Sequence, residues 1–193
     1  MNSILQRFFP AGFYYKTFMW PASMWMTYEH VIRNAAGLGK VADDHSDPDR
    51  YDKTNAHCDV LIAGGGGAGL MAALQAGRSG ARVILADEQN EFGGWLLGES
   101  DTTIDGKAPA DWVAGVVAEL EAMPEVTLLP RTTVFGYMDH NYITLTERVT
   151  DHLGARPAHL PRQRMWKVRA GQTVLAQGAH ERPLVFSGND LPG

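Results

Sequence analysis

The sequence predicts an α/β fold built around a parallel sheet, and three features of residues 57–95 lead to this prediction. Residues 60–63 and 83–85 are nearly all apolar, as strands that are buried on both faces of a sheet must be. A cluster of glycines at residues 64–69 opens the helix-forming stretch between these two runs. A carboxylate, Asp87, follows the second run. This order of strand, glycines, helix, strand and acid predicts a Rossmann-like domain.

The glycine cluster is the reason to expect a bound dinucleotide. Gly64, Gly66 and Gly69 match the spacing G-x-G-x-x-G. In this motif the first glycine permits a tight turn, the second lets the backbone approach a pyrophosphate, and the third lets the helix pack on the strand. The helix expected at residues 68–79 would direct its unpaired N–H groups at the phosphates. The residues predicted to hold the diphosphate are Gly64, Gly66, Gly67, Ala68 and Gly69.

The acid at the end of the second strand is expected to hold the ribose. Asp87 follows the glycines by about 20 residues, the position at which dinucleotide-binding domains bind the ribose hydroxyls. A carboxylate at this position favours an unphosphorylated ribose, as in NAD or FAD, over a ribose that carries a 2′-phosphate. Glu88 is the adjacent alternative. The glycine spacing does not choose between NAD and FAD, so both remain candidates.

The composition argues against several other classes of function. A formal net charge of −5 and a pI of about 5.8 give no electrostatic indication of binding to nucleic acid or to an anionic membrane. Cys58 is the single cysteine, which excludes an internal disulfide and suits a cytoplasmic location. The acidic residues 43–49 lack the glycine and the terminal glutamate of a calcium loop, so no metal site is predicted. No catalytic acid, base or nucleophile is predicted either.

Residues 1–56 are predicted to form an aromatic arm, a helix and an acidic linker in front of the domain. Charges and prolines interrupt the arm, so it lacks the roughly 20 consecutive apolar residues that cross a bilayer. The arm is expected to pack on its own domain or on a missing domain or subunit. Ser23 is expected to cap a helix that runs to about Ala36 and stops at Gly37, before the linker at residues 39–57. The expected buried side chains of this helix are Met26, Val31 and Ala35.

The chain after Asp87 carries further features of a flavoprotein cofactor domain. Gly93 and Gly94 follow the acid by a short loop, and a paired glycine at this position lines the cofactor cleft in flavoproteins that have two dinucleotide-binding domains. A later apolar strand at residues 174–176 ends near Gly178, where the backbone of such domains passes close to the dinucleotide. Gly93, Gly94 and Gly178 therefore join the predicted cofactor-binding residues.

The remaining elements predict one more helix and a layer of antiparallel strands. Residues 110–122 have the apolar face of an amphipathic helix. Strands and turns follow: strands are expected at residues 126–130, 132–138 and 142–148 with a hairpin turn at 139–141, and at 166–170 before a turn at Gly171. The predicted fold is thus an α/β, Rossmann-like, three-layer domain of the two-dinucleotide-binding flavoprotein type with a β-hairpin or meander. It spans residues 57–193 and is expected to be incomplete at its C-terminus.

Several longer motifs resemble one family, the alpha subunits of heterotetrameric sarcosine oxidases. The motifs are HCDVLIAGGGGAGL, ADEQNEFGG, GYMDHN, MWKVRA and GAHERPLVFSGNDLPG, preceded by PAGFYYKTFMWP and AAGLG. They cover nearly the whole chain, and the aromatic arm and GAHERP are more specific than the glycines. Two positions depart from the family pattern: Gly67, where the family usually has proline, and Gln177, which takes the place of a threonine.

The resemblance implies an oxidoreductase that acts on CH–NH groups. Such enzymes oxidise sarcosine to glycine and hydrogen peroxide, and they pass the one-carbon unit to tetrahydrofolate. The resemblance also implies NAD in this domain, FMN at the alpha–beta interface, FAD in the beta subunit and a folate-binding region elsewhere in alpha. Beta, gamma and delta subunits would be the partners. On this interpretation the chain is an internal segment of a longer subunit and is not active alone.

Two alternatives remain open at this point. The related alpha chains of proline or opine dehydrogenases share part of the motifs, as does hydrogen cyanide synthase, and such a chain would carry FAD in this site. A non-catalytic module, whose bound nucleotide serves assembly, is the other alternative.

Overall fold

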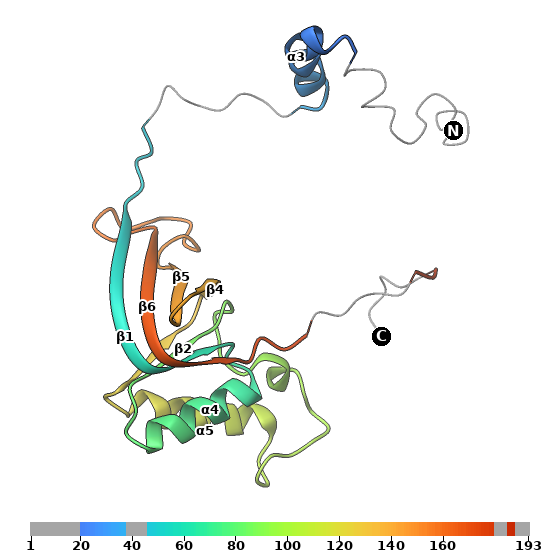
Figure 1. Cartoon of the computed structure of the whole chain (residues 1–193). Coiled ribbons are helices and arrows are strands. Elements are labelled where there is room, and N and C mark those ends of the chain that lie inside the picture. The colour runs from blue at the N-terminus through green and yellow to red at the C-terminus, as the bar shows by residue number, and fades with distance from the viewer. Residues whose placement is uncertain (1–19, 38–45, 180–184, 188–193) are drawn as a thin grey trace. The chain divides into compact units, whose positions relative to one another are not determined.

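The computed structural model describes residues 20–37, 46–179 and 185–187 of the 193-residue chain (Figure 1). It divides the chain into two compact units, residues 1–48 and 49–193. The predicted boundary between residues 56 and 57 lies inside the second unit. The linker prediction is wrong from residue 51 onward, because strand β1 begins there.

The first unit contains a 3-10 turn, Ala22–Met24, and helix α3, Trp25–Ala35. Gly37 follows the helix with a φ of +67°, as expected for a helix stop. The predicted cap is wrong, because Ser23 lies within the turn and the N-cap residue, Met24, makes no side-chain capping bond. The predicted burial is also wrong: Met26 and Val31 are about two-thirds exposed, at 66% and 65%, and Ala35 is exposed. No described side chain of α3 is buried, so the helix has no buried face. The aromatic arm before residue 20 and the acidic residues 39–45 lie outside the described residues.

The second unit carries one mixed six-stranded sheet. Its elements in chain order are β1 (Tyr51–Ala63), α4 (Gly67–Arg78), β2 (Val83–Ala86), η2 (Gly94–Leu97), α5 (Pro109–Glu121), β3 (Val126–Leu129), β4 (Thr132–Met138), β5 (Tyr142–Arg148) and β6 (Gln163–Leu175). The strand order is β3-β2-β1-β6-β5-β4. The first four strands in this order are parallel, and β5 and β4 run antiparallel to their neighbours.

Two apolar clusters cover the two faces of the parallel sheet. Helices α4 and α5 pack on one face, where Ile62 and Leu85 are buried among their side chains. The meander of β4, β5 and β6 folds over the other face, where Leu61 and Ile84 pack with Ile143 and its neighbours. Helices, parallel sheet and meander form the three layers that Figure 1 shows, so the prediction of a three-layer Rossmann-type domain with a meander is confirmed.

Strand β1 is much longer than the apolar run that predicted it. Between Tyr51 and Cys58 its side chains alternate between exposed and partly buried positions, as in a strand that has one face toward solvent. The exposed positions of this half include Lys53, Asn55 and His57. The consecutive polar residues 52–55 gave this half the composition of a linker, which is why the sequence prediction missed it.

Strand β6 is continuous where the sequence predicted two strands separated by a turn. It pairs with β1 on both sides of Gly171. A side chain at Gly171 would lie 2.9 Å from the carbonyl oxygen of Asp59, so this glycine permits a close approach of two strands and does not form a turn. The predicted hairpin turn between β4 and β5 is confirmed, since His140 and Asn141 both have positive φ.

The loop between β5 and β6 is fixed to the start of β1 by charged side chains. The guanidinium of Arg162 contacts the carboxylates of Asp49 at 2.8 Å and Asp151 at 2.5 Å. Hydrogen bonds from Gln163 and then Arg162 lower the pKa of Asp151. The backbone N–H of Arg162 also donates to the carbonyl oxygen of Arg50 at 2.7 Å. These contacts align the first residues of β1 and β6, which then pair along their whole length.

Some features of the described residues bear on chemistry. Cys58 is buried, and its burial raises the pKa of the thiol to about 11, so the thiol packs and does not react at neutral pH. Within the described ranges, no group of three or more His, Cys, Asp or Glu side chains could hold a metal ion. The helices described there are all too short or too polar to cross a membrane.

Candidate nucleotide-binding site

The glycine loop lies between the end of β1 and the start of α4. Gly64 has a φ of +106°, a conformation that favours glycine, and its N–H donates to the carbonyl oxygen of Ala86 at the end of β2. A side chain at this position would overlap the carbonyl of Ala176, just after β6. The carboxyl ends of β1, β2 and β6 therefore meet at this turn, as in a dinucleotide-binding crevice.

Gly66 differs from its neighbours because it faces open space. A side chain there would meet no atom within 4 Å. Gly66 is the N-cap residue of α4, and no side chain caps the helix. The N–H groups of Gly67, Ala68 and Gly69 begin the helix and have no acceptor within it, and the helix dipole adds partial positive charge there. The loop thus offers helix N–H groups without a helical acceptor beside an accessible volume, which is suited to a diphosphate.

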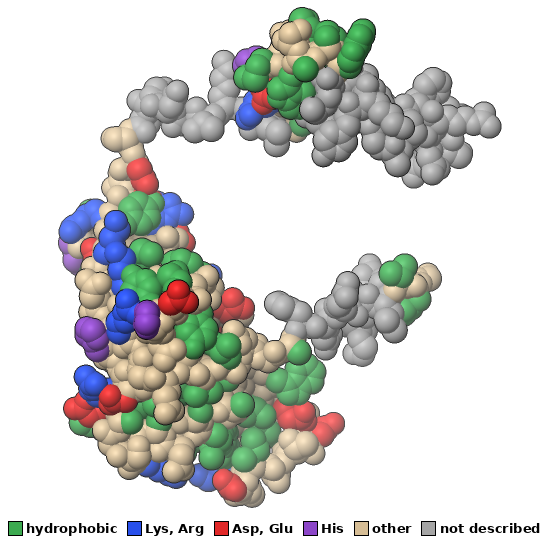
Figure 2. Space-filling model, in the orientation of Figure 1, with side chains coloured by type: hydrophobic (Ala, Val, Ile, Leu, Met, Phe, Trp, Pro, Cys, Tyr) green, Lys and Arg blue, Asp and Glu red, His purple; other side chains and the backbone are tan. Residues whose placement is uncertain are grey.

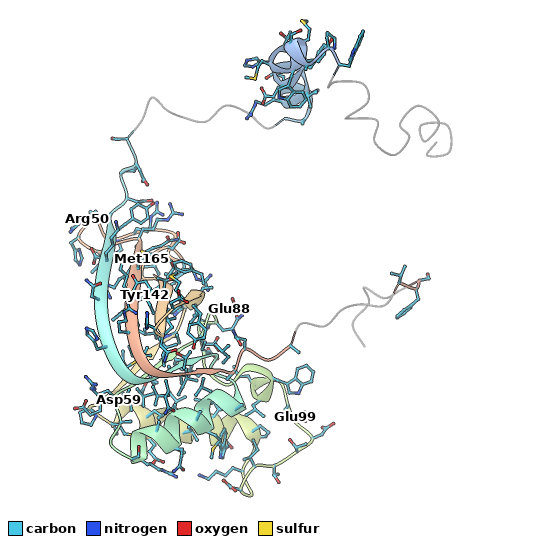
Figure 3. All side chains as sticks on the ribbon, viewed as in Figure 1. Arg50, Asp59, Glu88, Glu99, Tyr142 and Met165 are labelled. Carbon is cyan, nitrogen blue, oxygen red and sulfur yellow. The ribbon has the colours of Figure 1, made fainter. Side chains whose placement is uncertain are left out.

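Asp87 lies against this loop, as the sequence predicted. Its Oδ2 accepts a hydrogen bond from the N–H of Gly65 at 2.6 Å, and its Oδ1 accepts one from the N–H of Gln89 at 2.8 Å. A carboxylate has about four acceptor positions, so both oxygens keep capacity for a ribose hydroxyl. Glu88, labelled in Figure 3, is exposed, and its carboxylate accepts a hydrogen bond from the side chain of Gln89 at 3.5 Å. The structure therefore brings Asp87, rather than Glu88, to the loop.

The meander holds the turn that carries Asp87. The carbonyl oxygen of Asp87 accepts a hydrogen bond from the N–H of Thr132 at 2.7 Å, and that of Gln89 accepts one from Arg131 at 2.7 Å. The guanidinium of Arg148, at the end of β5, donates to the carbonyl oxygen of Glu88 at 2.5 Å. The sequence analysis missed these contacts, because nothing local marks residues 131 and 148 as neighbours of the acid.

Gly93 and Gly94 pack directly on the glycine loop. The N–H of Gly93 donates to the carbonyl oxygen of Gly65 at 2.8 Å, and Gly93 forms a parallel bridge with Gly66. A side chain at Gly94 would lie 3.3 Å from the Cα of Gly66. Gly93 is buried, and a side chain there would lie 2.8 Å from the side chain of Leu97, so only the exposed Gly94 can line a cleft beside the loop. Trp95, which follows them, is 78% exposed.

Gly178 lies on the far side of the same turn. It is exposed with a φ of +71°, two residues after the carbonyl of Ala176 that closes on Gly64. The nitrogen of Gln177 would lie 3.0 Å from a side chain at Gly64. The backbone at Gln177 thus passes close to Gly64.

These groups can bind a nucleotide, but they do not supply an acid or a base. The donors are backbone N–H groups, and the one carboxylate beside them is held by two backbone N–H groups. The arrangement fits the ADP half that NAD and FAD share, and the negative charge of Asp87 opposes a 2′-phosphate. No described residue of the loop is a candidate for proton transfer, so the site is suited to holding a cofactor that carries out the chemistry itself.

Comparison with known proteins gives a consistent result. A family model described as "FAD dependent oxidoreductase" matches residues 59–148. The chain is 56% identical over 195 aligned residues to the alpha subunit of sarcosine oxidase from Rhizobium meliloti (strain 1021), covering 100% of this chain and 20% of that protein. It is 52% identical to the corresponding protein of Corynebacterium sp. (strain P-1), covering 81% of this chain and 16% of that protein. The chain thus spans about a fifth of the length of these relatives.

More distant similarities agree on the fold. One of the subunits of opine oxidase from Agrobacterium tumefaciens (strain Ach5) is 32% identical over 70% of this chain and 26% of its own length. The crystal structure of L-proline dehydrogenase from P. horikoshii superposes with a TM-score of 0.55 at 26% identity, covering 79% of this chain and 28% of that chain. These similarities support a flavin or dinucleotide cofactor. Over its whole length the chain is homologous to the alpha subunits of sarcosine oxidase, and it corresponds to a Rossmann-type, dinucleotide-binding part of those proteins.

Proposed function

We propose that residues 64–69 and Asp87 hold the ADP half of NAD within the alpha subunit of a sarcosine oxidase. One observation carries this proposal: the Asp87 carboxylate is bonded to the N–H of Gly65, while Gly66 beside it faces open space. Free helix N–H groups and a ribose-binding acid therefore border the same accessible volume. NAD is preferred over NADP because the carboxylate would repel a 2′-phosphate.

The whole enzyme is proposed to oxidise sarcosine to glycine and hydrogen peroxide and to transfer the one-carbon unit to tetrahydrofolate. The 56% identity to a sarcosine oxidase alpha subunit supports this assignment. Beta, gamma and delta subunits are the proposed partners, with FAD in beta, FMN between alpha and beta, and folate bound elsewhere in alpha. A cytoplasmic location is proposed with it. We propose that this chain alone is inactive, since its described residues include no candidate acid or base at the site.

Each part of the site has a distinct proposed role. The N–H groups of residues 67–69 donate to the diphosphate, and Asp87 accepts hydrogen bonds from the adenosine ribose. Gly94 and Gly178 leave room for the dinucleotide along the cleft, and Gly93 allows the chain to pack against Leu97, Val113 and the glycine loop. The bound dinucleotide supplies hydride chemistry, and this chain binds it and sets its orientation.

FAD in the same site is the second candidate. The family model that matches residues 59–148 is one of FAD-dependent oxidoreductases. Opine oxidase and L-proline dehydrogenase, to which the chain is also similar, support the same candidate. The diphosphate and ribose contacts would be the same for either cofactor. The nucleotide that the enzyme carries therefore decides between the two candidates.

Denaturing the purified multi-subunit enzyme and quantifying every released nucleotide tests this choice. About one NAD per alpha subunit, beside the flavins, is the result expected from the proposal. A second equivalent of FAD with no NAD would favour the opine or proline dehydrogenase type. Release of no dinucleotide attributable to alpha would overturn both candidates. Absorbance separates flavin from NAD, and mass spectrometry identifies each species.

Asp87→Ala in the full-length alpha subunit is expected to lower nucleotide affinity about tenfold to a hundredfold. The change removes a charged acceptor from the ribose and frees the N–H of Gly65, and charged hydrogen bonds contribute about 1.5–3 kcal/mol each. Titration of the apo enzyme with NAD measures the effect.

Glu88→Ala is the matched control and should bind as the wild type does, because the Glu88 carboxylate lies away from the loop. A loss in Glu88→Ala with normal binding in Asp87→Ala would assign the ribose to Glu88. Loss of association between the subunits in Asp87→Ala, with unchanged turnover per assembled complex, would instead favour the assembly module.

A further inference from the structure

One face of the sheet in the second unit carries a row of basic side chains. The first halves of β1 and β6 pair with β5 and then β4, and paired residues point to the same side of a sheet. His57 pairs with Arg169, which pairs with Tyr142, which pairs with Met138. We call this surface the basic face; its residues are Lys53, Asn55, His57, Met165, Lys167, Arg169, Tyr142, Thr144, Thr146, Met138, Gly136 and Thr133.

The cations of the basic face form no ion pair with a carboxylate of the described residues. None of its residues is acidic. The guanidinium of Arg169 stacks over the ring of Tyr142 at 4.8 Å, and it donates to the carbonyl oxygens of Asp139 and His140. Lys53 and Lys167 take part in no ion pair among the described residues. The face is thus a local concentration of positive charge in a chain whose net charge is −5.

Three other arginines of this unit form ion pairs with carboxylates, in contrast to the cations of the basic face. Arg78 pairs with Glu119 at 2.7 Å, and Arg82 pairs with Asp59 at 2.7 Å. The same strands carry a paired arginine on their opposite face, where Arg164 contacts Glu147 at 3.2 Å. Three unpaired permanent charges on one face repel one another, which costs stability unless an opposite charge is supplied from outside.

No helix in the described part of the unit covers the basic face, although Thr144 within it is buried by neighbouring side chains. The apolar cluster under α4 and α5 includes Val60 and Ile62 of β1 and Val174 of β6, and it includes no residue of 51–57. Lys53, His57 and Arg169 are exposed. Figure 2 shows blue and purple side chains gathered over β1 and β6, away from the helices. The face is therefore available to another molecule.

Apolar side chains lie beside the cations on this face. Tyr142 and Met165, labelled in Figure 3, lie on the neighbouring strands β5 and β6, and Met138 is 46% exposed on β4. Protein interfaces are enriched in aromatic residues, Met and Arg. A surface that binds nucleic acid or lipid needs a positive electrostatic potential, which the net charge of −5 does not favour. The mixture fits a protein partner.

We propose that the basic face docks onto an acidic surface of another subunit of the same enzyme. The proposal rests on the proposed function in one respect, the existence of partner subunits. Opposite charges on the two surfaces would steer their encounter and would neutralise Lys53, Lys167 and Arg169. Tyr142, Met138 and Met165 would supply the apolar contact between them.

Charge reversal in the full-length alpha subunit tests this proposal. Lys167→Glu and Arg169→Glu are each expected to raise the dissociation constant for the partner subunits about tenfold or more at low ionic strength. The difference should shrink at high salt, because screening weakens the attraction in the wild type and the repulsion in the variants. Lys107→Glu is the matched control: it makes the same change of charge at an exposed lysine of the loop before α5 and should assemble as the wild type does.

The possible outcomes separate this proposal from the proposed function. Wild-type affinity in both variants, or a loss that Lys107→Glu shares, overturns the basic face as a docking surface. The choice of partner is overturned if the alpha subunit binds RNA or anionic vesicles in a salt-sensitive way and these variants abolish that binding while assembly is unchanged. Where Arg169→Glu lowers the unfolding temperature, Lys53→Glu at an exposed position repeats the test. Failure of the proposed function would instead appear as wild-type enzyme that releases no dinucleotide or has no partner subunit.

Discussion

Gly66→Ala is expected to empty the nucleotide site of the full-length alpha subunit without weakening its fold. The new methyl group would meet no protein atom within 4 Å, and the φ of −71° at this position suits alanine. The methyl would instead occupy the open volume in front of α4, where the diphosphate must approach the backbone. We expect an affinity loss of about a hundredfold, or ~2.7 kcal/mol. Calorimetric titration with NAD measures the loss, and thermal unfolding checks the fold.

Gly115→Ala is the matched control for this experiment. Gly115 lies in α5, is exposed, and a side chain there would also meet no atom within 4 Å. Both substitutions add one methyl group to an open surface, but Gly115 lies in a helix interior, where alanine is favoured over glycine, so the comparison is made on nucleotide binding. Gly115→Ala should bind nucleotide as the wild type does. Full nucleotide occupancy in Gly66→Ala would show that the diphosphate does not lie against this loop.

The first strand, helix and second strand could be predicted because their signals are local. Helix α4 starts one residue before the predicted start at residue 68 and ends one residue before the predicted end at residue 79. Strand β2 contains the whole predicted run of 83–85. The turn at Gly64 needs a φ of +106°, which glycine adopts readily, so a glycine at this position is itself a local signal of the turn.

The strands that depend on distant partners could not be predicted in the same way. Residues 51–57 form a strand because each pairs with a residue of 163–169, more than a hundred positions later in the chain. Gly171 looked like a turn because glycine often ends a strand, yet here it allows β6 to pass close to Asp59. Long-range pairing decides both cases, and no local pattern reports it.

The candidate site shows the same division between local and distant signals. The position of Asp87 follows from its spacing after the glycines, and its carboxylate faces the loop as that spacing predicts. The contacts that hold the acid in place come from Thr132, Arg131 and Arg148 of the meander. The meander therefore does more than cover the sheet, because it also fixes the turn that is proposed to bind the ribose.

Gly69→Ala is expected to weaken both the fold and the site. A side chain at Gly69 would overlap the carbonyl group of Gly64, and it would lie 3.5 Å from the side chain of Ile62. Helix α4 would have to move away from β1, and overpacking of this kind costs about 1–3 kcal/mol. The movement would also displace the helix N–H groups from the diphosphate. We expect a lower unfolding temperature of the full-length subunit, faster hydrogen exchange in residues 67–78 and loss of bound nucleotide.

Comparison of the two alanine variants separates binding from packing. Gly66 and Gly69 lie three residues apart in one motif, yet the first faces open space and the second faces a carbonyl group. Gly66→Ala should therefore lose nucleotide at unchanged stability, whereas Gly69→Ala should lose both together. A Gly69→Ala variant that is as stable as the wild type, with normal exchange in α4, would contradict the close packing of α4 on the turn. Equal destabilisation in the two variants would contradict the open volume at Gly66, on which the nucleotide site depends.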